Sequence, residues 1–167
     1  MAPITVVGPS IINFLHDLFT SIWIGGMIAL TFAVYPSIRK ILGKSEETEA
    51  MNASIKKKLS FLVYISIIGL LITGILMSRQ AIGLGLTTGF LSFTTEYAML
   101  LSIKHILYFI MIFLSIFRSQ IVDRVRKFTP QMKMRLNMMT LVLNILSGLA
   151  VLFLSSYLSV LAAVIAP

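Results

Sequence analysis

Two histidines are the side chains of this sequence best suited to bind a metal or a cofactor. The chain contains no cysteine, so thiolate metal sites, disulfides and cysteine nucleophiles are excluded. His16 and His105 each lie early in a long apolar segment. Ionisable residues inside a membrane are costly and often mark functional sites. Two neutral imidazoles that face each other across a helix bundle can be the axial ligands of a haem.

Other residues near the two histidines could complete such a site. Trp23 lies seven residues after His16, so it falls on the same face of a helix and could stack on a flat macrocycle. Gly26 would let a macrocycle or another helix approach closely. Arg79 and Lys104 could each bond a haem propionate at the outer edge of the membrane. We therefore expect a haem b site formed by His16, His105, Trp23, Gly26, Arg79 and Lys104, with the two histidines as metal ligands.

Plainer interpretations of the same residues stay open. Either histidine could be an interfacial residue whose ring is satisfied by a neighbouring carbonyl. Trp23 and Gly26 also suit ordinary helix packing, and Lys104 could extend to the membrane surface. Copper is the alternative to haem, because thioethers bind Cu(I) and the chain has ten Met. Methionine is, however, also common filler in apolar helices.

The segments that carry these residues are long and apolar. Of the 167 residues, 57% are hydrophobic and 12% are charged, and the mean hydropathy is +0.96. A membrane-spanning helix needs about 20 apolar residues, so the chain has room for four spans and for no separate catalytic domain. We expect an all-α, integral membrane, four-helix up-down bundle. It would form one transmembrane domain over residues 1–167, with helices at about 10–38, 59–77, 97–117 and 136–165.

The segments between these helices predict the topology. Residues 43–58 form a polar loop whose mixed charges suit a short surface helix, residues 83–89 a sizeable outer loop, and residues 118–135 a second basic loop. Six Lys and Arg lie in each of the segments 39–58 and 118–135, whereas Arg79 alone lies on the opposite side. By the positive-inside rule both basic segments face the cytoplasm and both termini lie outside. We expect a multi-pass protein of the plasma membrane.

The expected topology accounts for the net charge of +8. Its clustering in the two inner segments is a membrane signal, so we expect the lipid bilayer, and not nucleic acid, to be the partner of the basic residues. Anionic lipid of the inner leaflet would meet them.

The expected topology also places the two histidines at similar depth. The first and third spans both enter from outside, and counted from that boundary the depths of His16 and His105 differ by only about 5 Å. Counted from the basic inner ends at Arg39 and Arg118, the depths differ by about 15 Å. Tilt, or an extension of the first span beyond the membrane near Pro36, must absorb that difference.

Short motifs follow one another in a familiar order along the chain. They are His16 followed by Trp23-Ile-Gly-Gly26, then Thr73-Gly74, and then Thr94-Thr-Glu-Tyr97 leading to Leu100-Leu101 and Lys104. In these residues the chain resembles the copper-resistance D (CopD-like) family of four-helix membrane proteins, over all four helices. The resemblance implies a role in copper uptake or tolerance, with His16 and Lys104 as the residues carried over.

The chain departs from the CopD-like pattern in two ways. It is a single short unit, and His105 stands directly after Lys104, where an apolar residue is more usual. Membrane cytochromes of the b561 type are similar four-helix proteins that hold haem between histidines of different helices. The resemblance therefore leaves both copper and haem open.

Three functions from different classes follow. The first is a b-type cytochrome-like electron-transfer protein with haem between helices 1 and 3, exchanging electrons with quinone or with a membrane redox partner. The second is a CopD-like copper transport or tolerance protein, and the third is an accessory subunit of an oligomer or membrane complex. Two ligands at one depth suit a haem better than a transport path, which needs sites at successive depths. No phosphate loop or Ser-His-Asp arrangement occurs, so any enzymatic role would be non-hydrolytic electron transfer.

Overall fold

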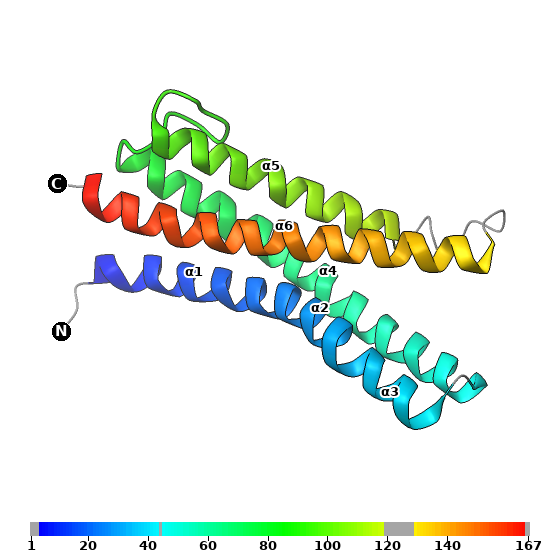
Figure 1. The fold of residues 1–167 in the computed structure, drawn as a ribbon. Coiled ribbons are helices and arrows are strands. Elements are labelled where there is room, and N and C mark those ends of the chain that lie inside the picture. Colours follow the sequence, from blue (N-terminus) through cyan, green and yellow to red (C-terminus); the bar gives the residue numbers. More distant parts are fainter. Residues whose placement is uncertain (1–3, 44, 119–128, 166–167) are drawn as a thin grey trace. The chain divides into compact units, whose positions relative to one another are not determined.

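The computed structural model describes residues 4–43, 45–118 and 129–165, and all regular secondary structure in these residues is helical (Figure 1). Four helices are long and apolar enough to cross a membrane: Val7–Leu42, Glu46–Gly83, Glu96–Ile116 and Gln131–Ile165. The chain is therefore an all-α, multi-pass membrane protein with four spans, which confirms the fold class expected from hydropathy.

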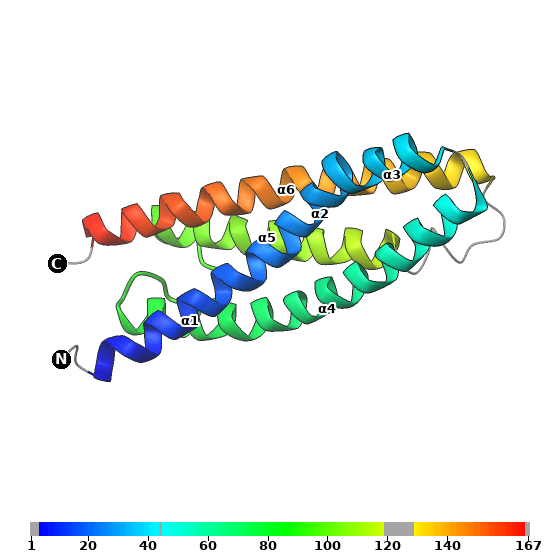
Figure 2. The ribbon, with the colours of Figure 1, turned by 90° about the horizontal axis from the view of Figure 1, so that it is seen from below.

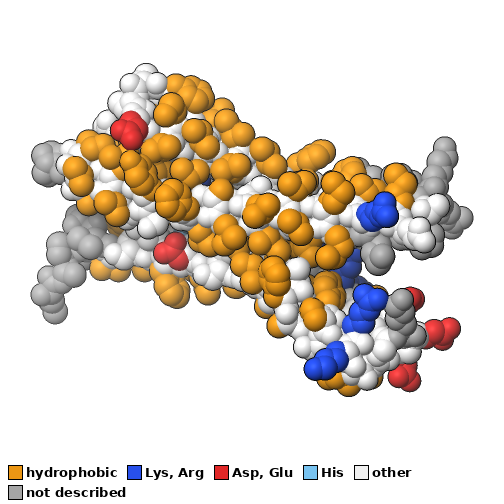
Figure 3. Space-filling view, in the orientation of Figure 1, with side chains coloured by type: hydrophobic (Ala, Val, Ile, Leu, Met, Phe, Trp, Pro, Cys, Tyr) orange, Lys and Arg blue, Asp and Glu red, His pale blue; other side chains and the backbone are white. Residues whose placement is uncertain are grey.

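The surface matches lipid as the solvent. Hydrophobic side chains cover most of the face shown in Figure 3. Large apolar residues such as Phe32, Phe113 and Phe153 are mostly exposed, an exposure that would be a liability in water. Backbone groups inside a bilayer must be satisfied within the chain, and helices achieve this with bonds inside each segment.

Contacts along the chain define two compact units, Met1–Gly74 and Ile75–Pro167. The first unit holds α1 (Ile4–Thr20), η1 (Ser21–Gly25), α2 (Gly26–Ala29), η2 (Leu30–Val34), α3 (Tyr35–Leu42) and most of α4 (Glu46–Gly83). The five short segments run on from one another as one long helix, in which η1 and η2 are π-helical. This first span begins at Ile4 and not near residue 10, as expected from the sequence.

The π-helical segments have local causes. Pro36 has no N–H to donate to the carbonyl of Phe32, so the α-helical bonding pattern fails within η2. Threonine hydroxyls bond carbonyls four residues earlier, from Thr20 to His16 at 2.8 Å and from Thr31 to Met27 at 2.7 Å. Such bonds compete with the backbone pattern and bend helices.

The helix α4 begins much earlier than hydropathy indicates. It starts at Glu46, so most of the expected polar loop at 43–58 is helical and continuous with the second span. Gly43 reverses the chain at a φ of 66°, which favours glycine. The Ser45 hydroxyl then accepts a hydrogen bond from the backbone N–H of Thr48 at 3.2 Å and so caps the helix.

The charged start of α4 must project from the membrane. Its first turn carries Glu46, Glu47 and Glu49, which favour the positive end of the helix dipole, and Lys56–Lys58 follow. Burying such a series of charged side chains in hydrocarbon would cost too much free energy. Most of the Lys and Arg side chains on the face shown in Figure 3 gather around α3 and this part of α4, so we expect both helices to extend beyond the lipid.

Within the first unit, α4 runs antiparallel to the first span. Gly26 of the first span lies against the Leu59 side chain of α4, and the Cδ1 atom of Leu59 would be 2.9 Å from a Cβ atom added at Gly26. Nearer the start of the first span, the ring of Phe19 covers Gly69 of α4. A side chain at Gly69 would overlap the Phe19 ring, so this close approach requires glycine.

The second unit contains the end of α4 and the helices α5 (Glu96–Ile116) and α6 (Pro130–Ile165), which lie side by side and antiparallel (Figures 1 and 2). Asn144 of α6 is buried and donates hydrogen bonds to the Met111 carbonyl at 3.2 Å and to the Ser115 hydroxyl at 2.8 Å. Such a side chain fixes how two helices align in a membrane.

The bounds of the later helices differ modestly from expectation. The second span continues to Gly83 and not only to residue 77, the third matches closely, and α6 starts at Pro130 and not at 136. The basic segment 118–135 falls largely outside the described residues, as do Arg124 to Lys127 within it. The expectation of a single transmembrane domain stays a prediction.

Candidate functional site

His16 lies on α1, half-buried, with its ring held by α4. Its Nδ1 atom is 2.9 Å from the Thr73 hydroxyl, and that hydroxyl is 2.8 Å from the carbonyl of Gly69. Thr73 is only 4% exposed. A hydroxyl has one proton, and a carbonyl can only accept. Since the Thr73 proton goes to Gly69, the Thr73 oxygen accepts a hydrogen bond from Nδ1–H of His16.

This chain of hydrogen bonds assigns the tautomer of His16. With the proton on Nδ1, the lone pair of the neutral ring is on Nε2. Metal-binding histidines nearly always donate their second ring N–H to a fixed acceptor, which sets both the tautomer and the ring orientation. Thr73 and Gly69 supply that acceptor, so His16 has the form a metal-binding histidine requires.

The side of the first span that carries His16 is the buried side. Thr20 is buried, Trp23 is 1% exposed and Met27 is fully buried, as the helical spacing from His16 predicts. Trp23 lies within η1, and π-helical turns often occur at functional sites. Gly26 has the Leu59 side chain as its close neighbour, so its packing against α4 explains the glycine without a cofactor.

His105 lies on α5 and is 9% exposed. Its Nε2 atom is 3.4 Å from the Ser78 hydroxyl, a long contact that leaves the tautomer open. The ring of Phe90 stacks on the imidazole, with centroids 3.9 Å apart and planes 21° apart. The Nδ1 atom is buried, and no described residue gives it a hydrogen bond of standard geometry, although the backbone of Phe90 lies close by. A buried polar atom in this state is expensive unless it binds something.

The loop that carries Phe90 folds back along α5. The Ser92 N–H donates to the Ser102 hydroxyl at 2.8 Å, and the same hydroxyl is 2.8 Å from the Ser92 carbonyl. Thr87 and Ser92 are buried. Non-helical backbone at membrane depth is tolerated where protein covers it. The loop between α4 and α5, which extends beyond the expected loop at 83–89, therefore covers the first turns of α5, including His105.

The two cationic side chains expected at the site lie in the second unit. Lys104 is half-buried on α5, directly before His105, and Arg79 is exposed in α4. His16 and Thr73 belong to the first unit, and His105, Ser78 and Phe90 to the second. The structure therefore describes two histidine environments, each by itself, and the pairing of the two histidines stays a prediction.

Sequence reasoning missed three of these neighbours as site residues. Thr73 appeared only as part of a motif, and Ser78 and Phe90 carried no signal, since an isolated serine or phenylalanine is common in apolar helices and loops. Among the described residues, no three His, Asp or Glu side chains gather as a metal site. A centre of that type is therefore not formed there, whereas axial ligation of a haem needs only two histidines.

Comparisons of this chain with protein families, with curated proteins and with solved structures find no match. The assignment of a function therefore depends on the residues just described.

Proposed function

We propose that this chain is a membrane electron-transfer protein of the b-type cytochrome kind, in which His16 and His105 are the axial ligands of one haem. The observation that carries the proposal is the chain from His16 through Thr73 to the Gly69 carbonyl. It holds the His16 ring in a fixed orientation. The second support is the buried Nδ1 of His105, which has no hydrogen bond of standard geometry among the described residues, although the backbone of Phe90 lies close by.

The positions of the histidines along their own helices agree with this proposal. His16 is twelve residues after Ile4, where the first span begins, and His105 is nine residues after Glu96, where α5 begins. At 1.5 Å per residue, the two lie about 18 Å and about 13 Å along their helices, a difference of about 5 Å. In the proposed topology Arg39 and Lys40, on the continuation of the first span to Leu42, would lie beyond the hydrocarbon, and this would account for the mismatch counted from the inner ends.

Each residue has a defined task in this proposal. When bound, haem b would supply a one-electron iron couple. Thr73 orients His16, while Trp23 and Met27 line its helix face and exclude water. Phe90 covers one face of His105 and limits its contact with solvent. Lys104 and Arg79 are the proposed partners of the haem propionates, and Gly26 stays a proposed cofactor contact only.

The same proposal sets the cellular context. The protein would lie in the plasma membrane with both termini outside, and would exchange electrons with quinone or with a membrane redox partner. It could act alone, as an oligomer or as a subunit of a larger complex.

The test is an optical spectrum of the purified protein. A reduced-minus-oxidised b-type band is expected in the parent chain, and His16→Ala and His105→Ala should each abolish it while the protein still inserts, because one ligand cannot hold a low-spin six-coordinate iron. Trp23→Leu should shift or weaken the band without removing it.

Other outcomes would assign the other functions. Copper without haem in the parent protein, lost in His16→Ala, would establish the transport function that the CopD-like resemblance implies. Unchanged haem and copper content in both histidine variants would exclude the two site functions and leave an accessory role.

A further inference from the structure

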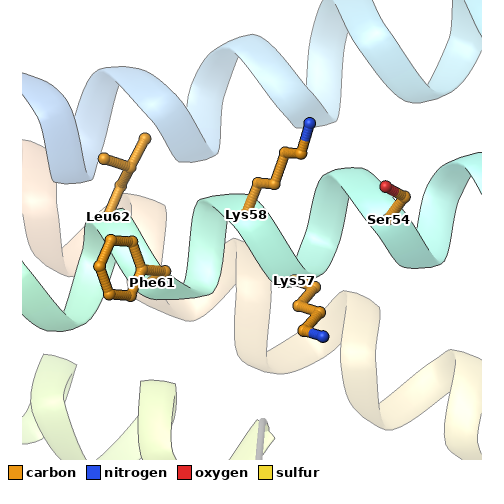
Figure 4. Close-up of a pocket in the computed structure, with 5 residues that line it drawn as sticks. All are labelled: Ser54, Lys57, Lys58, Phe61 and Leu62. Atoms are coloured by element: carbon orange, nitrogen blue, oxygen red, sulfur yellow. The ribbon is translucent and has the colours of Figure 1, made fainter.

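One face of α4 carries a hollow of about 640 Å³, lined by Ser54, Lys57, Lys58, Phe61 and Leu62 (Figure 4). These residues are three and four positions apart, so they share a broad side of the helix. In Figure 4, Ser54, Lys58 and Leu62 point to one side of α4, and Lys57 and Phe61 point to the other. The hollow therefore runs along the helix between two rows of side chains.

The lining changes from polar to apolar along the helix axis. The polar residues Ser54, Lys57 and Lys58 lie in the part of α4 that projects from the membrane, whereas Phe61 and Leu62 lie where the apolar run begins. Phe61 is 66% and Leu62 is 44% exposed. This order places the hollow at the boundary between water and hydrocarbon, the level at which lipid headgroups lie.

The lysines of the hollow favour an anionic ligand. Two lysines and one serine are among the residues that line it, and none of its described lining residues is acidic. Lysine ammonium groups are compact cations that bind phosphate as point charges. A lipid with a neutral headgroup would leave these two charges uncompensated.

We infer that this hollow binds one anionic phospholipid. Lys58 and Ser54 flank the headgroup phosphate from one side and Lys57 flanks it from the other, and an acyl chain lies between Phe61 and Leu62. Free phosphate could contact the lysines as a headgroup does, but it has no acyl chain to contact the apolar residues. The inference does not depend on the proposed redox function.

The experiment measures lipid binding to the purified chain in detergent by native mass spectrometry, with phosphatidylglycerol and phosphatidylcholine as probes. The parent should retain phosphatidylglycerol in preference to phosphatidylcholine. The double variant Lys57→Gln/Lys58→Gln should bind phosphatidylglycerol about 30-fold more weakly, because each basic residue near the membrane surface contributes separately to the attraction. Its control is Arg39→Gln/Lys40→Gln, which removes the same charge from exposed positions on α3.

The outcomes separate a built site from general attraction. Equal weakening in both double variants, or equal retention of the two lipids by the parent, would overturn the inference. Phe61→Ser should lower the affinity for phosphatidylglycerol but leave competition by inorganic phosphate unchanged. If inorganic phosphate displaces the lipid and Phe61→Ser has no effect, the hollow binds phosphate alone, and the lipid assignment fails.

Discussion

A single hydroxyl proton decides the chemistry available at His16. Thr73 gives its proton to the Gly69 carbonyl and accepts the Nδ1 proton of His16. If the hydroxyl were absent, the ring would lose the acceptor that fixes its tautomer, and rotation of the ring would become less restricted. In the proposed haem site, the orientation of the His16 ring would thus depend on a residue that touches no cofactor.

Thr73→Val tests this dependence, because valine keeps the branched shape and removes the hydroxyl. Haem affinity should fall about 10-fold to 100-fold, the usual effect of losing the partner of a metal-binding histidine. Haem titration followed by absorbance measures the change, and Thr73→Ser should restore most of the affinity.

The matched control is Thr140→Val. Thr140 is also buried and also bonds a carbonyl four residues earlier, that of Leu136 at 2.8 Å, but it forms no hydrogen bond with a histidine of the described chain. Equal losses of affinity in Thr73→Val and Thr140→Val would show that a buried threonine matters only for helix stability.

At the scale of helices and loops, hydropathy predicted the number of spans and their centres because lipid contact requires apolar side chains along about 20 residues. It could not show where helices end, since α4 continues as a charged helix to Glu46 once it leaves the lipid. Nor could it show that Thr73 meets His16 or that Phe90 stacks on His105. Thr73 and His16 are 57 residues apart in the chain, and such pairings follow from tertiary packing.

The close approach of α1 and α4 depends on Gly69. Gly69→Ala should lower the free energy of unfolding by about 1–3 kcal/mol, because the new methyl group would overlap the Phe19 ring. Thermal unfolding in detergent measures the effect. Gly74→Ala, five residues further along α4 with open space around its Cα, should be neutral or slightly stabilising.

A double variant shows whether Phe19 is the cause. Phe19→Ala combined with Gly69→Ala should lose less stability than the two single variants added together. Strict additivity would mean that the ring and the glycine do not interact.

The loop over α5 depends on Ser102. Ser102→Ala removes the hydroxyl that accepts a hydrogen bond from the Ser92 N–H, so amide exchange in residues 84–95 should become about tenfold faster, as expected for the loss of one hydrogen bond. Hydrogen exchange with mass spectrometry measures this rate. Ser66→Ala is the control, because Ser66 is fully buried and its hydroxyl has no hydrogen-bond partner in the described chain; a similar acceleration there would argue against a specific tether.

For the whole molecule, the orientation in the membrane is the property that the charges predict and that no contact in the structure tests. Twelve of the fourteen Lys and Arg lie in two segments, and this asymmetry predicts that both segments are cytoplasmic. The absence of cysteine makes the prediction simple to test.

Single cysteines at Lys57, Arg79 and Glu96, all exposed positions, should be labelled by an impermeant maleimide in intact cells at positions 79 and 96 only. Position 57 should react after the cells are opened. Labelling of position 57 in intact cells, with positions 79 and 96 protected, would show that the orientation is the reverse of the predicted one.

The π-helical segment η1 has a consequence for how the first span could be altered. A π-helical turn holds one more residue than the α-helical turn it replaces, so it acts as a single-residue insertion. Deleting one residue between Ser21 and Gly25 would restore a regular α-helix and would leave the segments before and after it in nearly their present orientation, so His16 would stay on the helix face that Met27 and Leu30 occupy. Deleting one residue between Asp17 and Thr20, where the helix is regular, would instead rotate His16 away from that face by about 100°. The first span can therefore lose one residue within η1, but not within the last turn of α1, without misdirecting His16.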